Sequence, residues 1–269
     1  MTNPTPDRNP ADELLAERRG SVHWLTFNRP QARNALTWRM YDRLVEECDA
    51  VNRDRSVRAM VLTGAGGQAF VAGTDIAQFR DFASERDALD YEARGSEVMR
   101  AIESVRVPTI AAIAGACTGA GGAIAAACDL RIAAASARYG FPIARTLGNC
   151  LSMSNYARVS ALVGVARLKD LIFRARLMDA QEMLAAGMLI EVTPDESSLL
   201  IRAQEVALEV GSHAPLTLWA TKEALRRLRD HTIPPDADRD LIVRCYLSRD
   251  FKEGVEAFLA KRKPVWTGE

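Results

Sequence analysis

Residues 109–129, TIAAIAGACTGAGGAIAAACD, decide the fold of this 269-residue chain. The run is uncharged up to its last residue and is long enough to be considered as a membrane span. Pro108 precedes it, however, and four glycines interrupt its middle. The pattern predicts a buried strand over 109–114, a glycine-rich turn over 115–122 and a short buried helix over 123–128. We therefore expect a soluble core and no membrane span.

The bulk composition bounds the class of protein. Apolar residues make up 48% of the chain, which is enough for one large hydrophobic core, and 35 basic residues balance 35 acidic ones. Zero net charge argues against a nucleic-acid partner. The five cysteines lack metal-ligand spacing, so we expect reduced thiols, a cytoplasmic location and no metal. The polar, proline-rich start predicts a disordered leader over residues 1–15.

Hydrophobic periodicity divides the rest of the chain into two regions. Strands alternate with helices over residues 16–196, which predicts an α/β core with crossover connections. Only helices are expected over residues 197–269. The further strands are expected at 21–27, 57–63, 70–72, 130–134 and 189–192, and the further helices at 36–51, 83–105, 199–210, 216–228, 238–247 and 251–261.

Four motifs in a fixed order carry a resemblance to a known family. They are NRPQARNAL at 28–36, FVAGTDI at 70–76, GACTGAGGAIAAACD at 115–129 and EGVEAFLAKRKP at 253–264. Together they resemble the enoyl-CoA hydratase/isomerase (crotonase) superfamily. The resemblance implies a spiral of repeated ββα turns with a C-terminal helical region that forms a homo-trimer or a dimer of trimers. It also implies an acyl-CoA substrate, with coenzyme A arriving as part of the substrate and no permanently bound cofactor.

The resemblance assigns an oxyanion hole to the backbone N–H groups of Thr74 and Ala120. Such a pair stabilises the negative charge that develops on a thioester oxygen, and losing one donor typically costs about 10²–10³ in rate. Because the backbone does this work, threonine and alanine side chains do not disable the site. Without the resemblance, the first turn is equally well explained as a tight strand-to-helix turn capped by Asp75.

The two glutamates that handle protons in the hydratases are absent from the corresponding positions. Alignment of the motifs puts Ala123 at the first position and Ile143, or Ala144 after a one-residue slip, at the second. None of these side chains can donate or accept a proton. We therefore expect an apolar pocket and chemistry other than two-carboxylate hydration.

A polar cluster follows the second missing glutamate and offers substitutes. Arg145 is a candidate partner for a substrate carboxylate, and Cys150 is a candidate nucleophile without an obvious histidine partner. On the helix at 83–105, Tyr91 and Glu92 are expected to serve packing and solvation rather than chemistry. The cluster comprises Arg145, Thr146, Asn149, Cys150, Ser152 and Asn155, of which Asn149 and Cys150 are also expected to line the pocket.

The resemblance further assigns residues that contact coenzyme A. Lys261 matches a lysine that reaches the nucleotide of a neighbouring subunit, although a basic residue there also complements the dipole of a helix C-terminus. Phe258 is expected to pack rather than to contact the ligand. The remaining assigned residues are Gln31, Ala32 and Arg33 in the first motif and Ala72, Asp75 and Ile76 in the second.

Three functions remain open from the sequence. The leading one is an acyl-CoA enzyme with non-hydratase chemistry, namely decarboxylation, thioester hydrolysis or C–C cleavage. Decarboxylation needs the least acid/base help, because loss of CO₂ generates the enolate directly. The alternatives are a hydratase/isomerase with a substitute acid/base group and a catalytically silent acyl-CoA-binding subunit.

Overall fold

The computed structural model describes residues 13–213, 215–230, 239, 243 and 246–265. A six-stranded sheet lies at its centre, with every neighbouring pair parallel except the first, which is antiparallel. Its strands, in spatial order, are β1 (Leu14–Arg19), β2 (Val22–Phe27), β3 (Ala59–Gly64), β5 (Thr109–Ile113), β7 (Leu130–Ala134) and β10 (Glu191–Thr193).

A second sheet, of four strands, contains the strands that lie in sequence between those of the first sheet. Successive turns of the chain place one strand in the first sheet, the next in the second sheet, and then form a helix, which is the predicted ββα spiral. Parallel pairing of sequential turns requires these crossovers. The strands of the second sheet are β4 (Ala69–Val71), β6 (Ala116–Thr118), β8 (Arg138–Gly140) and β9 (Met178–Asp179).

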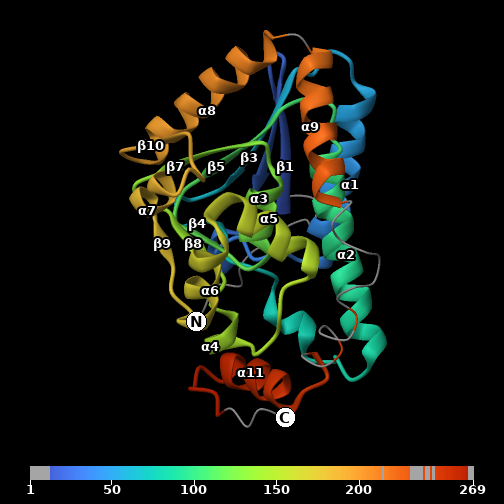
Figure 1. The fold of residues 1–269 in the computed structure, drawn as a ribbon, viewed down its shortest axis with the longest axis vertical. Coiled ribbons are helices and arrows are strands. Elements are labelled where there is room, and N and C mark those ends of the chain that lie inside the picture. The colour runs from blue at the N-terminus through green and yellow to red at the C-terminus, as the bar shows by residue number, and fades with distance from the viewer. Residues whose placement is uncertain (1–12, 214, 231–238, 240–242, 244–245, 266–269) are drawn as a thin grey trace, which may run out of the picture.

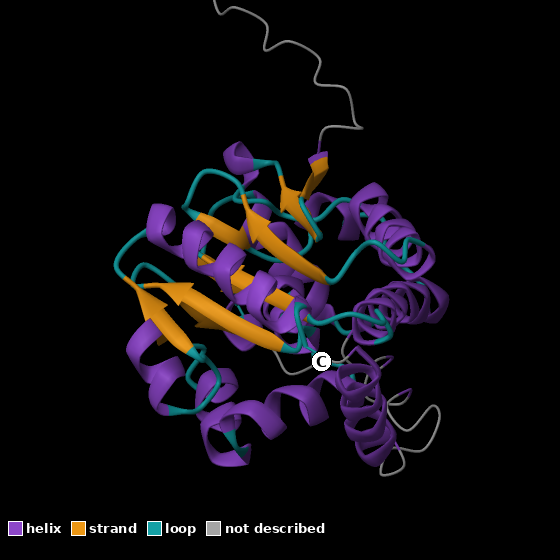
Figure 2. Cartoon of the chain, turned by 90° about the horizontal axis from the view of Figure 1, so that it is seen from above, coloured by secondary structure: helices purple, strands orange, loops and turns teal. Residues whose placement is uncertain are grey.

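Helices surround the two sheets (Figures 1 and 2). The short 3₁₀ helices are η2 (Pro30–Ala32) and η3 (Ile76–Phe79). The α-helices are α1 (Trp38–Arg53), α2 (Glu85–Glu103), α3 (Ala120–Ala127), α4 (Ile143–Thr146), α5 (Met153–Val163), α6 (Val165–Phe173), α7 (Ala180–Ala185), α8 (Glu196–Gly211), α9 (Pro215–Asp230) and α11 (Arg249–Leu259).

Alternation along β2 builds two cores, one on each face of the large sheet. Leu25 and Phe27 face the larger core, which α1, α2 and α3 enclose, while Val22 and Trp24 face the stripe of apolar residues on α8. The Trp24 indole N–H also donates to Gln204 of α8 at 2.7 Å. This packing leaves α3 inside the molecule, beside β6 and β4.

The strand–turn–helix prediction for residues 109–128 is confirmed in outline and wrong in detail. The expected glycine-rich turn contains the buried strand β6, and the following helix begins at Ala120 rather than Ala123. Gly115 and Gly119, both with positive φ, mark the two ends of β6. The three residues of β6 show no alternating pattern and the glycines on either side are a turn signal, so the sequence concealed this strand.

Two other predictions, the leader over residues 1–15 and the helix at 238–247, are not confirmed as stated. Strand β1 begins at Leu14, inside the segment predicted as a leader, and Leu14 is buried against the sheet through its pairing with Phe27. The predicted helix at 238–247 lies largely outside the described residues. The other predicted strands and helices are confirmed, with ends shifted by a few residues.

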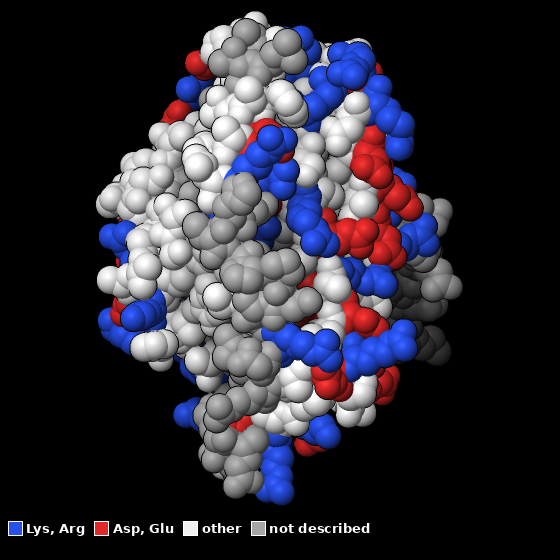
Figure 3. Space-filling view, turned by 45° about the vertical axis from the view of Figure 1, so that its right-hand side comes forward, with Lys and Arg blue, Asp and Glu red and all other residues white. Residues whose placement is uncertain are grey.

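On the face drawn in Figure 3, basic and acidic side chains are interspersed and neither sign dominates. Within the described residues, no helix has both the length and the apolar character that crossing a membrane requires.

Candidate active site

Two tight turns meet at the centre of the site. Gly73, with φ of 120°, follows β4, and Gly119, with φ of 55°, follows β6. A side-chain carbon added at Gly119 would lie 3.5 Å from the Gly73 Cα atom, so the two backbones are close neighbours. The Thr118 hydroxyl donates to the Ala72 carbonyl at 3.0 Å and ties the turns together. The positive φ angles at both positions are the reason that the sequence needs glycine here.

The residue after each glycine offers an amide to the cavity between the turns. These are Thr74 and Ala120, and neither backbone N–H has an acceptor among the described residues. Ala120 is the first residue of the buried helix α3, where backbone N–H groups lack intrahelical partners and the helix dipole favours an anion. The two amides expected to bind a thioester oxygen thus open onto one cavity.

The cavity has a volume of about 500 Å³ and combines most of the residues expected from the sequence. Ala123 and Ile143, the positions at which the resemblance would place the two glutamates, are both buried in its wall. Its other expected lining residues are Ala32, Arg33, Ala72, Thr74, Asp75, Ile76, Ala120, Asn149 and Cys150. A cavity of this size is open to a small acyl group rather than filled by packing.

Three hydroxyl groups, those of Thr74, Tyr41 and Tyr91, lie together in one part of the cavity wall. The Thr74 hydroxyl lies 2.7 Å from that of Tyr41 and 3.0 Å from that of Tyr91. Burial raises the pKa of Tyr41 to about 12, against the hydrogen bonds from Thr74 and Tyr91 that lower it. Burial, together with the charge of Glu92 and the neighbouring Tyr41, also raises the pKa of Tyr91. These phenols therefore remain protonated donors at neutral pH.

A carboxylate, a phenol and an amide form a second polar group in the same cavity. The Tyr246 hydroxyl donates to Glu92 Oε1 at 2.6 Å and accepts from Asn149 Nδ2 at 3.1 Å. Glu92 follows Tyr91 on α2, and the Tyr91 hydroxyl contacts that of Thr74. Glu92 and the Thr74 turn therefore line neighbouring parts of the same cavity wall. The packing role expected for Tyr91 is confirmed by its ring contacts with Trp38 and Phe79, whereas Glu92, expected on a solvated face, lines the cavity. The cavity wall is mostly apolar, as expected, and contains these polar groups.

The other carboxylate among the described lining residues is committed to structure. Asp75 caps η3 by accepting from the Ala77 N–H at 3.2 Å, and it pairs with Arg29 at 3.1 Å. Arg29 in turn contacts Glu13 at 3.2 Å. These contacts fulfil the capping role expected for Asp75 and leave Glu92 as the better-placed carboxylate for chemistry.

Residues expected at the coenzyme A end occupy the surface around the cavity. Ala32 and Arg33 line it, whereas Gln31 and Lys261 are exposed and do not. Phe258, three residues before Lys261, lines the cavity with 49% of its surface exposed, so the expectation of simple packing is wrong. An exposed basic rim of this kind suits a phosphate-rich ligand.

Arg145 does not belong to the cavity. It is exposed on the short helix α4, and the described lining residues do not include it. Residues two positions apart on a helix point in directions that differ by about 200°. Arg145 therefore points away from the cavity when Ile143 points into it. Thr146 and Leu147, three and four residues after Ile143, do line the cavity. The role expected for Arg145 as a carboxylate partner is therefore wrong for the pocket of this subunit.

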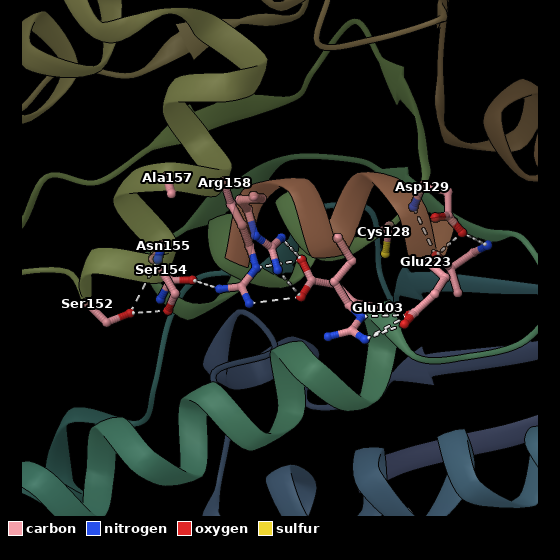
Figure 4. A network of polar contacts seen from close by, with 12 residues as sticks. Glu103, Cys128, Asp129, Ser152, Ser154, Asn155, Ala157, Arg158 and Glu223 are labelled. Carbon is pink, nitrogen blue, oxygen red and sulfur yellow. Dashed lines mark hydrogen bonds and ion pairs between the residues drawn. The ribbon is translucent and has the colours of Figure 1, made fainter. Parts of the chain in front are cut away.

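A buried ion cluster braces the helices around the cavity (Figure 4). Glu103 of α2 accepts from Arg158 of α5 at 2.7 and 2.9 Å, and also from Arg229 of α9. Arg158 donates further to the cavity-lining Asn155 at 3.0 Å. Burial would raise the pKa of Glu103, but the hydrogen bonds from both arginines hold it below its ordinary value.

Sequence reasoning missed two contributors to the cavity. Tyr246 lies in the region expected only to mediate assembly, and its 154-residue separation from Glu92 gives no local signal. Gly95 of α2 also lines the cavity, and a side-chain carbon there would meet nothing within 4 Å. The spacing of Glu92, Gly95 and Met99 places all three on one helix face, and this signal was present in the sequence.

Comparison with known proteins identifies the family of this chain. The family model for enoyl-CoA hydratase/isomerase matches residues 17–269. The short-chain-enoyl-CoA hydratase of Clostridium acetobutylicum is 34% identical, over 94% of this chain and 96% of that protein. The 2,3-dehydroadipyl-CoA hydratase of Escherichia coli is 32% identical, over 95% and 99%.

Two solved structures with a similar fold are named for different reactions. An enoyl-CoA hydratase/carnithine racemase from Magnetospirillum magneticum superposes with a TM-score of 0.77 at 32% identity, covering 96% of each chain. A methylmalonyl-CoA decarboxylase in complex with 2-nitronate-propionyl-CoA superposes with a TM-score of 0.86 at 28% identity, covering 96% of this chain and 99% of that one. The chain belongs to the enoyl-CoA hydratase/isomerase family and is an acyl-CoA enzyme of the crotonase superfamily.

Proposed function

We propose that the protein hydrates or isomerises a carbon–carbon double bond next to an acyl-CoA thioester, with Glu92 as the acid/base group. The observation that carries this proposal is the Glu92 carboxylate in the cavity wall, held by the Tyr246 hydroxyl at 2.6 Å. A carboxylate at the reacting carbons is what Ala123 and Ile143 cannot supply. Relatives named as hydratases support this function over the non-hydratase chemistry that the sequence favoured.

The thioester oxygen binds between the Thr74 and Ala120 amides. Negative charge on this oxygen grows when the substrate becomes an enolate, and the N-terminus of α3 adds to the field that stabilises it. Arg33 and Ala32, with Gln31 and Lys261 on the outer surface, contact the coenzyme A portion. Coenzyme A enters and leaves as part of the substrate.

The proton transfers follow from this arrangement. In hydration, Glu92 takes a proton from water while the water oxygen bonds to Cβ, and the double-bond electrons move into the thioester enolate. Protonated Glu92 then returns the proton to Cα. In isomerisation, Glu92 removes a proton from Cα and delivers it to Cγ. One carboxylate serves both steps in each case.

The open cavity, with polar groups in a mostly apolar wall, argues against a catalytically silent binding subunit. A blocked pocket around Ala123 and Ile143 would favour that function, whereas about 500 Å³ remains open. Hydroxyl groups of Tyr41, Tyr91 and Tyr246 lie in or beside the wall.

Decarboxylation is the second candidate. Its support is the close superposition on a methylmalonyl-CoA decarboxylase. The same oxyanion hole serves this reaction, because the enolate left by departing CO₂ needs stabilisation and no base. The exposed position of Arg145 removes the carboxylate partner expected for such a substrate.

The assembly state and location are also proposals. We propose a cytoplasmic homo-trimer or dimer of trimers in which the C-terminal helices make subunit contacts. Light scattering of the purified protein distinguishes these masses from that of a 29.5 kDa monomer.

A panel of thioesters tests the function. The purified protein is incubated separately with crotonyl-, 3-hexenoyl-, malonyl- and methylmalonyl-CoA, and each reaction is followed by mass spectrometry. We expect crotonyl-CoA to gain one water, or 3-hexenoyl-CoA to become the 2-enoyl isomer. Loss of CO₂ with neither of these reactions would establish the second candidate, and release of free coenzyme A would establish hydrolysis. Binding without turnover would establish the silent subunit.

A further inference from the structure

The buried pair of Arg158 and Glu103 fixes the orientation of the Asn155 side chain (Figure 4). A guanidinium group has only donors, so the Asn155 atom that lies 3.0 Å from Arg158 Nη1 is the amide oxygen. The other two nitrogens of Arg158 donate to Glu103 at 2.7 and 2.9 Å, which holds the guanidinium in place. The backbone N–H of Asn155 donates to the capping Ser152 hydroxyl at 3.4 Å. One end of the amide is therefore committed to structure.

The amide nitrogen at the other end is an open donor. Asn155 Nδ2 carries two N–H groups, has no hydrogen-bond partner among the described residues and retains solvent-accessible surface. Because Asn155 lines the cavity, this nitrogen is the part of its amide that is available to a molecule bound there. A ligand that displaces water from the nitrogen without offering an acceptor leaves the donors unpaired, which costs free energy. A ligand with an acceptor at this point is therefore preferred.

This donor belongs to the end of the cavity away from the oxyanion hole. The Tyr91 hydroxyl of α2 contacts the Thr74 turn at 3.0 Å, and Glu103 at the end of α2 is joined to Asn155 through one arginine. The helix rises by about 18 Å between Tyr91 and Glu103. Gly95 lies between these two points and lines the cavity. An acyl chain that follows α2 thus reaches Asn155 several carbons beyond the thioester.

The charges around the cavity select the kind of acceptor. Among the described lining residues, Arg33 is the one cation, and it lies at the end assigned to coenzyme A. The positive charge of Arg158, behind Asn155, is already paired with Glu103. A carboxylate at the end of the acyl chain would have no cation of its own here, and an unpaired charge is strongly disfavoured away from water. A neutral oxygen accepts from the amide without this cost.

We propose that the acyl group of the substrate carries a neutral oxygen, as a carbonyl or a hydroxyl group, that accepts a hydrogen bond from Asn155 Nδ2. This inference rests on the acyl-CoA substrate of the proposed function and names its class. The oxygen lies several carbons beyond the reacting double bond, so no bond to it forms or breaks. Asn155 selects the substrate and takes no part in the proton transfers.

Binding of saturated acyl-CoA compounds, which cannot be hydrated or isomerised, tests this contact by isothermal titration calorimetry. The matched pairs are hexanoyl-CoA with 5-oxohexanoyl-CoA and octanoyl-CoA with 7-oxooctanoyl-CoA. We expect the oxo compound of at least one pair to bind the wild type at least about tenfold more tightly. Asn155→Asp keeps an oxygen for Arg158 but replaces the donor, so it should abolish this preference. Asn155→Leu should abolish it too if the first variant folds poorly, and circular dichroism monitors both.

Thr146→Val is the matched control. Thr146 also lines the cavity, but its hydroxyl already donates to the Pro142 carbonyl at 3.0 Å, so its loss should change both members of a pair equally. No preference for either oxo compound in the wild type, or a preference that survives both Asn155 variants, would overturn the inference. Tighter binding of the carboxylate adipyl-CoA than of 5-oxohexanoyl-CoA would overturn the assignment to a neutral oxygen.

Failure of the proposed function gives a different result. Because the saturated compounds report binding alone, the preference for an oxo group is measured whether or not the protein turns over enoyl-CoA. A wild-type protein that shows the preference but neither hydrates crotonyl-CoA nor isomerises 3-hexenoyl-CoA would support the Asn155 contact and overturn the proposed function.

Discussion

Tyr246 donates a 2.6 Å hydrogen bond to the Oε1 atom of Glu92 across 154 residues of sequence. Glu92 belongs to a helix of the spiral core, and Tyr246 to the C-terminal helical region. The contact makes that region part of the candidate active site as well as a candidate assembly surface.

Removing this hydroxyl should change the pH dependence of the reaction. The Tyr246 hydroxyl stabilises the charged form of Glu92, so Tyr246→Phe makes the carboxylate a weaker acid. A base must be deprotonated to act, and the acid limb of the kcat profile should therefore move to higher pH. A hydrogen bond to a charged group is worth about 1.5–3 kcal/mol, or about one to two pH units. A lower rate with an unmoved profile would contradict this assignment.

Replacing the first residue of α3 tests the oxyanion hole. Ala120→Pro deletes the N–H at the one helical position where proline fits without breaking the helix. We expect the rate to fall by about 10²–10³ with the circular dichroism spectrum unchanged. Ala120→Ser, which keeps the N–H, should lose far less. Equal losses in both variants would show that the side chain, not the amide, matters.

Gly95 should set the size of the acyl group. Its position on the inner face of α2 leaves open space where a side chain would project. Gly95→Leu should therefore increase the preference for crotonyl-CoA over 2-octenoyl-CoA by at least about tenfold in kcat/KM, since each methylene in an apolar pocket is worth about 1–3 kcal/mol. Ala93→Leu, on the exposed face of the same helix, is the control. An unchanged preference in Gly95→Leu would place the acyl chain elsewhere.

The Glu103 cluster should contribute to stability at neutral pH. Glu103→Gln leaves Arg158 buried without its carboxylate, and such a loss costs about 3–5 kcal/mol of unfolding free energy. Glu205→Gln breaks an exposed pair with Arg202 and should cost less than about 1 kcal/mol. Urea unfolding of both variants measures the difference.

The pH dependence of this effect has a definite sign. The folded-state pKa of Glu103 lies below its ordinary value of 4.5, so the contribution to stability is fully present above pH 4.5. It is lost as the pH falls through the folded-state pKa. The stability difference between wild type and Glu103→Gln should therefore narrow in acid, and a difference that widens below pH 4.5 would contradict the assignment.

Local pattern predicted the strands and helices with clear periodicity, but it predicted no element between residues 135 and 188, where the structure has β8, β9 and α4 to α7. The stripe of apolar residues on α1 and the strand β7 at Leu130–Ala134 have strong periodicity or β-branched, apolar character, and both are confirmed. Strand β6 was missed because alanine, cysteine and threonine between two glycines carry no periodic signal. Its existence depends on pairing with β4 and β8, which are distant in sequence.

Residues that line the cavity were predictable where local motifs mark them and not where distant side chains meet. Thr74 and Ala120 follow from glycine turns and the family motifs. The Tyr246–Glu92 contact depends on how the C-terminal region folds back, and no local rule gives that. Arg145 was misassigned because chemical suitability was weighed without its direction, which is opposite to that of Ile143 on a single helical turn.

Crotonyl-CoA hydration by Glu92→Gln, compared with wild type and Glu97→Gln, tests the central claim most directly. Glu97 is exposed on the same helix, so its variant controls for the loss of one charge. We predict that Glu92→Gln loses about a hundredfold or more of the rate while Glu97→Gln retains it. Wild-type hydration that persists in Glu92→Gln would contradict the account, because another group would then carry the proton.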